Sequence, residues 1–231
     1  MGLGAKAFHY LHELLTVQGV TFPTDLRMLE LGNMILEKRG LIVPFISKYG
    51  GKWDRVAKGY FEGLGFSHTS IDINGLNGSL SLDLRKPFPK ELGKFDVLTD
   101  FGTIEHIIDN QYRVFKNFHD AAAPGALMVH TLPGTGYGHG YWSYPVSFFE
   151  NLVTHCGYFI LDLRVSWMKY NHPASHNSYK RTIFVGLIKG KDNEFMGISK
   201  WQNPVLDKLG HNKCCGNRYD TFIRNCLRGN R

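Results

Sequence analysis

The chain has 231 residues, of which 43% are hydrophobic and 20% charged, and its net charge is +7. This is an ordinary globular composition, and a chain of this length can bury a sizeable core. No apolar run approaches the roughly 18 residues that cross a bilayer, which argues against a membrane-spanning segment. Residues 1–9 lack the long apolar region of a signal peptide, so we expect a cytoplasmic protein.

Apolar spacing and the placement of Gly and Pro predict strands that alternate with helices. Residues 3–18 have helical spacing, and Gly19 and Pro23 end this helix. Two segments interrupt this pattern. Residues 33–52 are expected to form a loop or a short helix, and residues 169–180 are expected to form a loop. The strands are expected at 26–31, 68–73, 80–84, 95–101, 126–132, 159–166 and 182–188, and the other helices at 53–64, 103–120 and after Pro145.

This order predicts an α/β fold with a doubly wound, mostly parallel seven-stranded sheet and helices on both faces. The last two strands are joined without a helix, so we expect them to form an antiparallel pair at one edge. The domain organisation that follows is an N-terminal helix in 1–25 that packs on a core domain of 26–190, and a basic C-terminal appendage in 191–231.

The charge of the chain is concentrated in its last segment. Residues 200–231 hold seven Lys or Arg and two Asp, a net charge of +5. Such a segment can meet nucleic acid, an anionic membrane surface or an acidic substrate, or it can be a solvated helical appendage. The segment contains no dense run of basic residues, which favours the solvated appendage and makes a nucleic-acid partner the less favoured interpretation.

Acidic residues stand where three predicted strands end, in Leu29-Glu30-Leu31-Gly32, Ile71-Asp72-Ile73 and Leu82-Asp83-Leu84. Open α/β sheets bind ligands outside the carboxyl ends of their strands. Carboxylates at that edge can accept hydrogen bonds from the hydroxyl and amino groups of a nucleoside. The sequence therefore predicts a nucleoside cofactor site.

Together with the segment 95–106 and the turn 124–126, these strand ends resemble class I S-adenosylmethionine-dependent methyltransferases. The resemblance covers residues 26–190 and implies S-adenosyl-L-methionine as the cofactor. It places the methionine portion at Glu30 and Gly32, the ribose hydroxyls at Asp72, and the adenine at Asp83 and Leu84. It also places Phe101 and Gly102 beside the sulfonium.

The first motif departs from the family pattern. Gly32 is followed by Asn33, and no further glycine occurs before Gly40. In addition, Glu30 and Asp72 are 42 positions apart where about 20 is usual, so we expect an insertion within 33–52. A non-catalytic Rossmann-like binding protein with a degenerate cofactor loop is the alternative that this departure leaves open.

The loop 133–144 is the predicted acceptor site, because it follows the fifth strand and combines glycines with aromatic residues. Tyr137, Tyr141 and Trp142 would supply flat walls, and His106 would face the same site. His139 is the candidate general base, since histidine has a suitable pKa for taking a proton from a hydroxyl. The competing interpretation is that the aromatic residues and His139 merely pack over the sheet edge.

We expect no metal site from the sequence. No cysteine pair is spaced C-x-x-C, and Cys156 is expected to lie in a core helix. His172 and His176 have a ligand-like spacing, but Pro173 argues against the helix that would align them.

The predicted function is methyl transfer to a small molecule, with a hydroxyl as the acceptor. Methyl transfer to nucleic acid is the second enzymatic interpretation. No oligomeric state is predicted.

Overall fold

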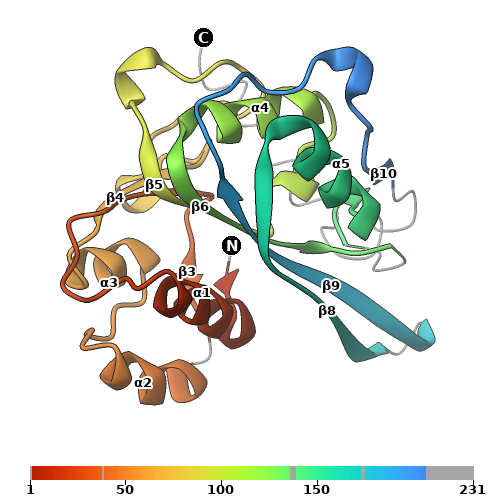
Figure 1. Cartoon of the computed structure of the whole chain (residues 1–231). Coiled ribbons are helices and arrows are strands. Elements are labelled where there is room, and N and C mark those ends of the chain that lie inside the picture. The colour runs from red at the N-terminus through yellow and green to blue at the C-terminus, as the bar shows by residue number, and fades with distance from the viewer. Residues whose placement is uncertain (1, 38, 136–138, 173–174, 207–231) are drawn as a thin grey trace, which may run out of the picture.

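The computed structural model describes residues 2–37, 39–135, 139–172 and 175–206, with side chains left out of the description at 168–180. Its centre is a six-stranded sheet (Figure 1). In spatial order the strands are β4 (Ser67–Ile71), β2 (Arg27–Leu31), β5 (Phe95–Phe101), β6 (Ala122–Pro133), β9 (Ser175–Lys189) and β8 (Tyr158–His172). The first four are parallel, and β9 is antiparallel to both of its neighbours. The mostly parallel sheet and its antiparallel edge pair are therefore confirmed.

Helices cover both faces of this sheet, as predicted (Figure 1). On one face lie α1 (Ala5–Val17), α2 (Arg39–Lys48) and α3 (Ala57–Gly63), and on the other lie α4 (Gln111–Ala121) and α5 (Val146–Cys156). Neighbouring residues of a strand point to opposite faces. Met28 accordingly packs in the core under α1 and α3, whereas Leu29 packs in the core under α4 and α5. Cys156 is fully buried in α5, as expected.

The predicted strand at 80–84 is reduced to one bridge between Leu80 and Ile71, so the sheet of the described residues has six strands rather than seven. The chain turns instead of continuing, because the Asp83 carboxylate accepts a hydrogen bond from the Arg85 backbone N–H at 3.0 Å. The Lys86 N–H also returns to the Asp83 carbonyl. Local side-chain bonds of this kind compete with strand pairing.

Two other predicted boundaries are wrong. The helix expected at 103–120 is a single 3-10 turn, Ile104–His106, followed by α4 from Gln111, with a break at Asn110 in the left-handed region (φ 56°). The loop expected at 169–180 belongs largely to strands, since Lys169 pairs with Tyr179 and His172 with Ser175. That end of the hairpin is defined by main-chain pairing, and its sequence has no alternating apolar pattern. The strands there could therefore not be predicted from the sequence.

Four short strands form two small sheets that are separate from the six-stranded sheet. The segment predicted as a loop or short helix at 33–52 contains β3 (Ile35–Leu36) and α2, and β3 pairs in parallel with β1 (Gly2–Leu3). Near the other end, β10 (Val205–Leu206) pairs with β7 (Trp142–Ser143), and Phe195 and Met196 are buried in the core. Because of β1 and β3, the N-terminus lies over the carboxyl edge of the parallel strands.

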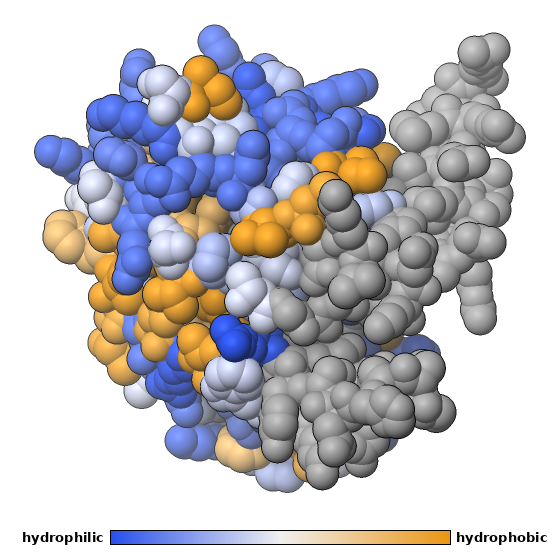
Figure 2. Space-filling model, turned by 90° about the vertical axis from the view of Figure 1, so that its right-hand side faces the viewer, coloured by the Kyte–Doolittle hydropathy of each residue, from blue (hydrophilic) through white to orange (hydrophobic). Residues whose placement is uncertain are grey.

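The surface of the hairpin side is shown in Figure 2, where apolar patches lie between polar regions. Its exposed apolar side chains include Phe159 and Trp167 of the edge strand β8 and Val205 of β10. None of the helices within the described ranges is both long enough and apolar enough to cross a membrane. The boundaries proposed at residues 25 and 190 remain predictions.

Candidate functional site

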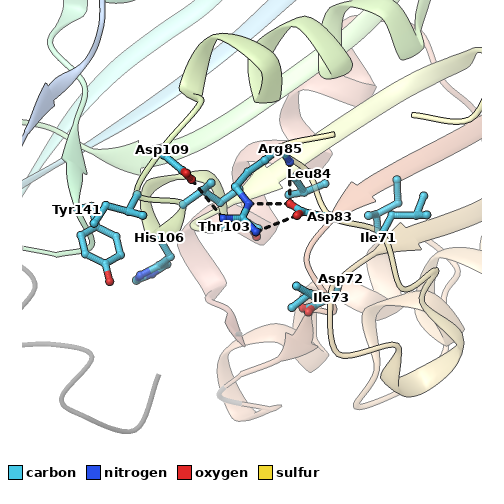
Figure 3. A pocket seen from close by; sticks show the side chains of 13 residues that line it. Ile71, Asp72, Ile73, Asp83, Leu84, Arg85, Thr103, His106, Asp109 and Tyr141 are labelled. Carbon is cyan, nitrogen blue, oxygen red and sulfur yellow. Dashed lines mark hydrogen bonds and ion pairs between the residues drawn. The ribbon is translucent and has the colours of Figure 1, made fainter. Parts of the chain in front are cut away.

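A cavity of about 160 Å³ lies outside the carboxyl ends of β4 and β5 (Figure 3). We call it the first cavity. Asp72 and Ile73 form one side and His106 and Tyr141 the other, with Asp83, Leu84 and Arg85 between them (Figure 3). The remaining lining residues are Ile71, Leu82, Thr103, Ile107, Ile108 and Asp109. The predicted ribose and adenine residues therefore do converge on one cavity at the ligand edge of the sheet.

Asp72 is held in place by the turns on either side of it. Its Oδ2 accepts a hydrogen bond from the Asn33 N–H, and its Oδ1 accepts one from the Asn74 N–H, both at 3.0 Å. A carboxylate has about four acceptor positions, so two remain for a ligand. Asp72 therefore both closes the turn after β2 and offers acceptor positions to the first cavity.

Asp83, which lies between the two sides of this cavity, forms a two-point ion pair with Arg85. Arg85 Nε and Nη2 each lie 2.8 Å from one Asp83 oxygen, and Arg85 Nη1 lies 3.4 Å from Asp109 (Figure 3). Hydrogen bonding to the guanidinium lowers the pKa of the Asp83 carboxyl below its ordinary value. Asp83 thus stays ionised in mildly acidic solution, and it is oriented by a side chain that the sequence did not single out.

Glu30 and Gly32 lie outside the lining of the first cavity. The Glu30 side chain is 1% exposed: its Oε1 accepts the Met34 N–H at 3.1 Å, and its Oε2 lies 3.7 Å from His68 Nε2. Gly32 adopts a positive φ of 95° and donates its N–H to the Ile71 carbonyl. Neither residue lines the first cavity, and their described contacts shape the turn between β2 and β3.

Thr103 joins the ends of the two central strands. Its hydroxyl donates to the Leu31 carbonyl at 2.7 Å, and its N–H donates to the buried Asp100 carboxylate at 3.1 Å. Asp100 also lies 3.3 Å from His130 Nδ1. This network fixes the chain as it leaves β5, so the residues after Phe101 have a defined position between two cavities.

A second cavity of about 430 Å³ lies on the other side of the end of β5. Phe101, Gly102, Glu105 and His139 line it at the β5 end. Its other walls come from the N-terminal segment, from Glu37 and Leu41, from the end of β6, and from the middle of β8 and β9. These residues include Gly4, Lys6, Leu132, Ser166, Thr182 and Phe184. Phe101 and Gly102 thus border this second cavity rather than the first.

Three side chains meet between the cavities: Glu105, His106 and His139. Glu105 Oε1 lies 3.7 Å from His106 Nε2 and 3.6 Å from His139 Nε2. The two imidazole rings are 4.9 Å apart and nearly perpendicular, at 80°. His106 lines the first cavity, whereas Glu105 and His139 line the second. This cluster is where two molecules bound in the two cavities would face each other.

Residues of the loop 133–144 lie in different surroundings in the structure. Tyr141 lines the first cavity, and its N–H donates to the Glu105 carbonyl at 2.7 Å. Trp142 lines neither of the two cavities: its indole N–H donates to the Ile107 carbonyl at 2.7 Å, and the ring packs against the α4–α5 core. Tyr137 lies outside the described residues. Trp142 is thus a packing residue where a substrate wall was predicted.

Sequence reasoning missed several residues of both cavities. Arg85 and Thr103 could have been found among the sequence neighbours of the predicted site residues, since each lies within two residues of one. Lys6 and Thr182 were not, because they are far apart along the chain and carry no motif. Glu105 was not among the predicted site residues, because the helix dipole is a sufficient reason for a glutamate near a helix start.

Comparison with known proteins gives matches among solved structures. No protein-family model matches the chain, and no curated protein matches it. A structure of TehB from Haemophilus influenzae has a TM-score of 0.50 at 11% identity, covering 78% of this chain and 61% of that one. The N-methyltransferase NodS from Bradyrhizobium japonicum WM9, bound to S-adenosyl-L-homocysteine, has a TM-score of 0.49 at 10% identity, with coverages of 81% and 88%.

A third match is phosphoethanolamine N-methyltransferase 2 from Haemonchus contortus in complex with S-adenosyl-L-methionine. Its TM-score is 0.49 at 16% identity, covering 79% of this chain and 52% of that one. At 11% identity the TehB match indicates the fold alone. Together with the strand order it shows that the chain has a Rossmann-like α/β fold.

Proposed function

We propose that the protein is an S-adenosylmethionine-dependent methyltransferase that acts on a small molecule. The observation that carries the proposal is the first cavity, which is lined by Asp72 and Asp83 together with aliphatic side chains (Figure 3). This is a suitable lining for a nucleoside, which has flat apolar faces and polar edges. The second cavity, on the other side of the end of β5, provides room for an acceptor.

In this proposal Asp72 accepts the ribose hydroxyls with its two remaining acceptor positions. Asp83 and Leu84 position the adenine, and Arg85 keeps the Asp83 carboxylate oriented. The methionine portion extends towards Gly32 and Glu30, and the sulfonium lies near Phe101 and Gly102. His106 and Tyr141 close the cavity on the acceptor side.

The acceptor in this proposal is a hydroxyl group that enters from the second cavity. Its oxygen attacks the methyl carbon, the carbon–sulfur bond breaks, and the products are the methyl ether and S-adenosyl-L-homocysteine. The proton of the hydroxyl is released at the Glu105–His139 pair, where His139 acts as the base and the carboxylate stabilises the charged imidazole. Because the displacement is in line, most of the rate comes from positioning the two molecules.

The test is calorimetric titration with S-adenosyl-L-methionine and S-adenosyl-L-homocysteine. We expect both to bind to the protein, and Asp72→Ala to weaken binding at least about tenfold, since each hydrogen bond to a charged group contributes about 1.5–3 kcal/mol. Asp120→Ala is the matched control, because Asp120 pairs with Lys116 on the exposed surface of α4. Thermal unfolding of each variant checks that the turn after β2 is intact.

Two results would contradict the proposal. If neither compound produces heat at millimolar concentration, the chain is not a methyltransferase. If both bind and Asp72→Ala matches the control, the ribose site is elsewhere.

A nucleic-acid acceptor is the second candidate, and the basic charge of residues 200–231 is the observation that favours it. Neutralised phosphates release counterions, so such binding would weaken steeply with salt. We expect no steep salt dependence for the true acceptor.

A further inference from the structure

We propose that Glu105, His106 and His139 bind one divalent transition-metal ion of the zinc class, with an open coordination position towards the second cavity. These are the residues whose ligand atoms come together within 4.8 Å of one another in the described part of the chain. The proposal departs from the sequence-based expectation of no metal, which considered only cysteine spacing and the pair His172 and His176.

The distances within the cluster are close to those of a formed site. Ligands that bind Zn²⁺ at about 2.0–2.2 Å in a tetrahedral arrangement lie about 3.3–3.6 Å from one another. Here Glu105 Oε1 is 3.6 Å from His139 Nε2 and 3.7 Å from His106 Nε2. Two of the three separations are therefore within a few tenths of an ångström of those in a formed site, and all three ligand atoms lie within 4.8 Å of one another.

The backbone holds the two halves of the cluster together. Glu105 and His106 are adjacent in the 3-10 turn, and the loop that carries His139 is attached to this turn by the Tyr141 N–H bond to the Glu105 carbonyl. Gly140 has a φ of +73°, and a Cβ there would lie 2.6 Å from Glu105 Cγ and 2.8 Å from the Glu105 carbonyl oxygen. Only a glycine lets the loop approach so closely.

Gly102 makes room on the opposite side of the same carboxylate. Its φ is +83°, and a Cβ there would lie 3.2 Å from Glu105 Oε1. Two glycines thus surround the Glu105 side chain, which is 1% exposed. Such crowding keeps a ligand in one rotamer, which is what a rigid site requires.

The donor set indicates the class of ion. Two imidazoles and one carboxylate suit zinc and other first-row divalent transition ions, whereas Mg²⁺ and Ca²⁺ prefer sites made of oxygens. Three protein ligands leave one position open, as in catalytic zinc sites. His139 is 29% exposed and borders the second cavity, so the open position faces the acceptor side.

The role of the ion rests on the proposed function. An acceptor hydroxyl in the open position would bind through its oxygen, and the ion would lower the pKa of that hydroxyl. With its Nε2 bound to the ion, His139 would not take the proton, which would leave to solvent or buffer. The ion thus replaces the direct base role given to His139 above.

The experiment measures Co²⁺ binding to the full chain freed of metal, because Co²⁺ occupies such sites and absorbs in the visible range. We expect one Co²⁺ per chain, displaced by Zn²⁺ and not by Mg²⁺. His106→Gln, His139→Gln and Glu105→Gln should each weaken binding at least about 100-fold, more than the loss typical of an outer-shell residue. His155→Gln in α5 is the matched control and should leave binding unchanged.

Binding that is equal in the three variants and the control would overturn the site, as would a spectrum dominated by thiolate charge transfer, which would place the ion on cysteine. S-adenosyl-L-homocysteine affinity is measured on the same samples. Retained nucleoside binding with lost Co²⁺ binding in His139→Gln and Glu105→Gln, whose sites line the second cavity, shows that these variants are folded. Co²⁺ binding without any nucleoside binding would support the metal site and sink the methyltransferase proposal, so the two failures are distinguishable.

Discussion

The two cavities on either side of the end of β5 are built in different ways. The first is lined by residues 71–109 and Tyr141, so nearly all of its wall comes from one stretch of the chain. The second combines the N-terminal segment, Glu37, the ends of β5 and β6, and the β8–β9 hairpin. The proposed cofactor side is thus local in sequence, whereas the proposed acceptor side depends on segments that are far apart in the chain. Substitutions should therefore affect the two cavities separately.

Gly140→Ala is expected to give the largest difference between its effects on the two cavities. Its Cβ would collide with Glu105, so the loop that carries His139 must move, and we expect Co²⁺ affinity to fall at least about tenfold, or about 1.4 kcal/mol. S-adenosyl-L-homocysteine affinity should fall less than Co²⁺ affinity, because Asp72 and Asp83 are untouched and only Tyr141 of the first cavity is attached to the loop that moves. Cobalt titration and calorimetry measure the two quantities.

Gly19→Ala is the control for backbone strain. Gly19 has nearly the same φ, +72°, but a Cβ there would meet nothing within 4 Å. If Gly140→Ala and Gly19→Ala both bind Co²⁺ like the unmodified chain, the close approach at Gly140 has no part in the site.

A smaller effect, confined to the first cavity, is expected from Arg85→Met. The guanidinium holds the pKa of Asp83 below its ordinary value, and the carboxylate is ionised above that pKa. Without the guanidinium the pKa of Asp83 rises, because its side-chain hydrogen bond is lost while burial still favours the neutral carboxyl. More Asp83 is then protonated at pH 5 than at pH 7.5.

S-adenosyl-L-homocysteine affinity of Arg85→Met should therefore fall a few-fold more at pH 5 than at pH 7.5. Calorimetry at the two pH values measures this. Arg164→Met serves as the control, since Arg164 pairs with Glu13 and Asp162 away from the cavity. An equal loss at both pH values would show that protonation of Asp83 does not govern binding.

The smallest effect is expected from Lys6→Gln and Thr182→Val. Both residues line only the second cavity, so nucleoside affinity should change by less than about twofold, about 0.4 kcal/mol. A tenfold loss in either variant would mean that the cofactor extends into the second cavity, and the division between the two sides would fail.

The first cavity comes mostly from one stretch of the chain and the second from distant segments, and this difference explains which residues could be predicted from the sequence. The bounds of β5 were predicted to the residue, and Asp72, Asp83 and Leu84 were placed at the correct edge, because a buried strand followed by an acidic turn is a local pattern. The second cavity has no such pattern. Lys6 reaches it because β1 pairs with β3, a contact that no periodicity in either short segment indicates.

Individual side chains show the limit of composition-based reasoning. Trp142 was predicted as a substrate wall from its neighbours, yet its indole N–H is used by the Ile107 carbonyl, so the ring faces the core. Glu105 was passed over because a glutamate at a helix start is common. Its role emerges only when Gly140 brings His139 against it.

The central claim is that the first cavity is the cofactor site, and a crystal structure of the protein with S-adenosyl-L-homocysteine tests it most directly. The account predicts density for the nucleoside between Asp72 and Asp83, with the sulfur directed towards Gly102 and Glu105. Density in the second cavity with the first left empty, or a nucleoside bound without contact to Asp72, would contradict it.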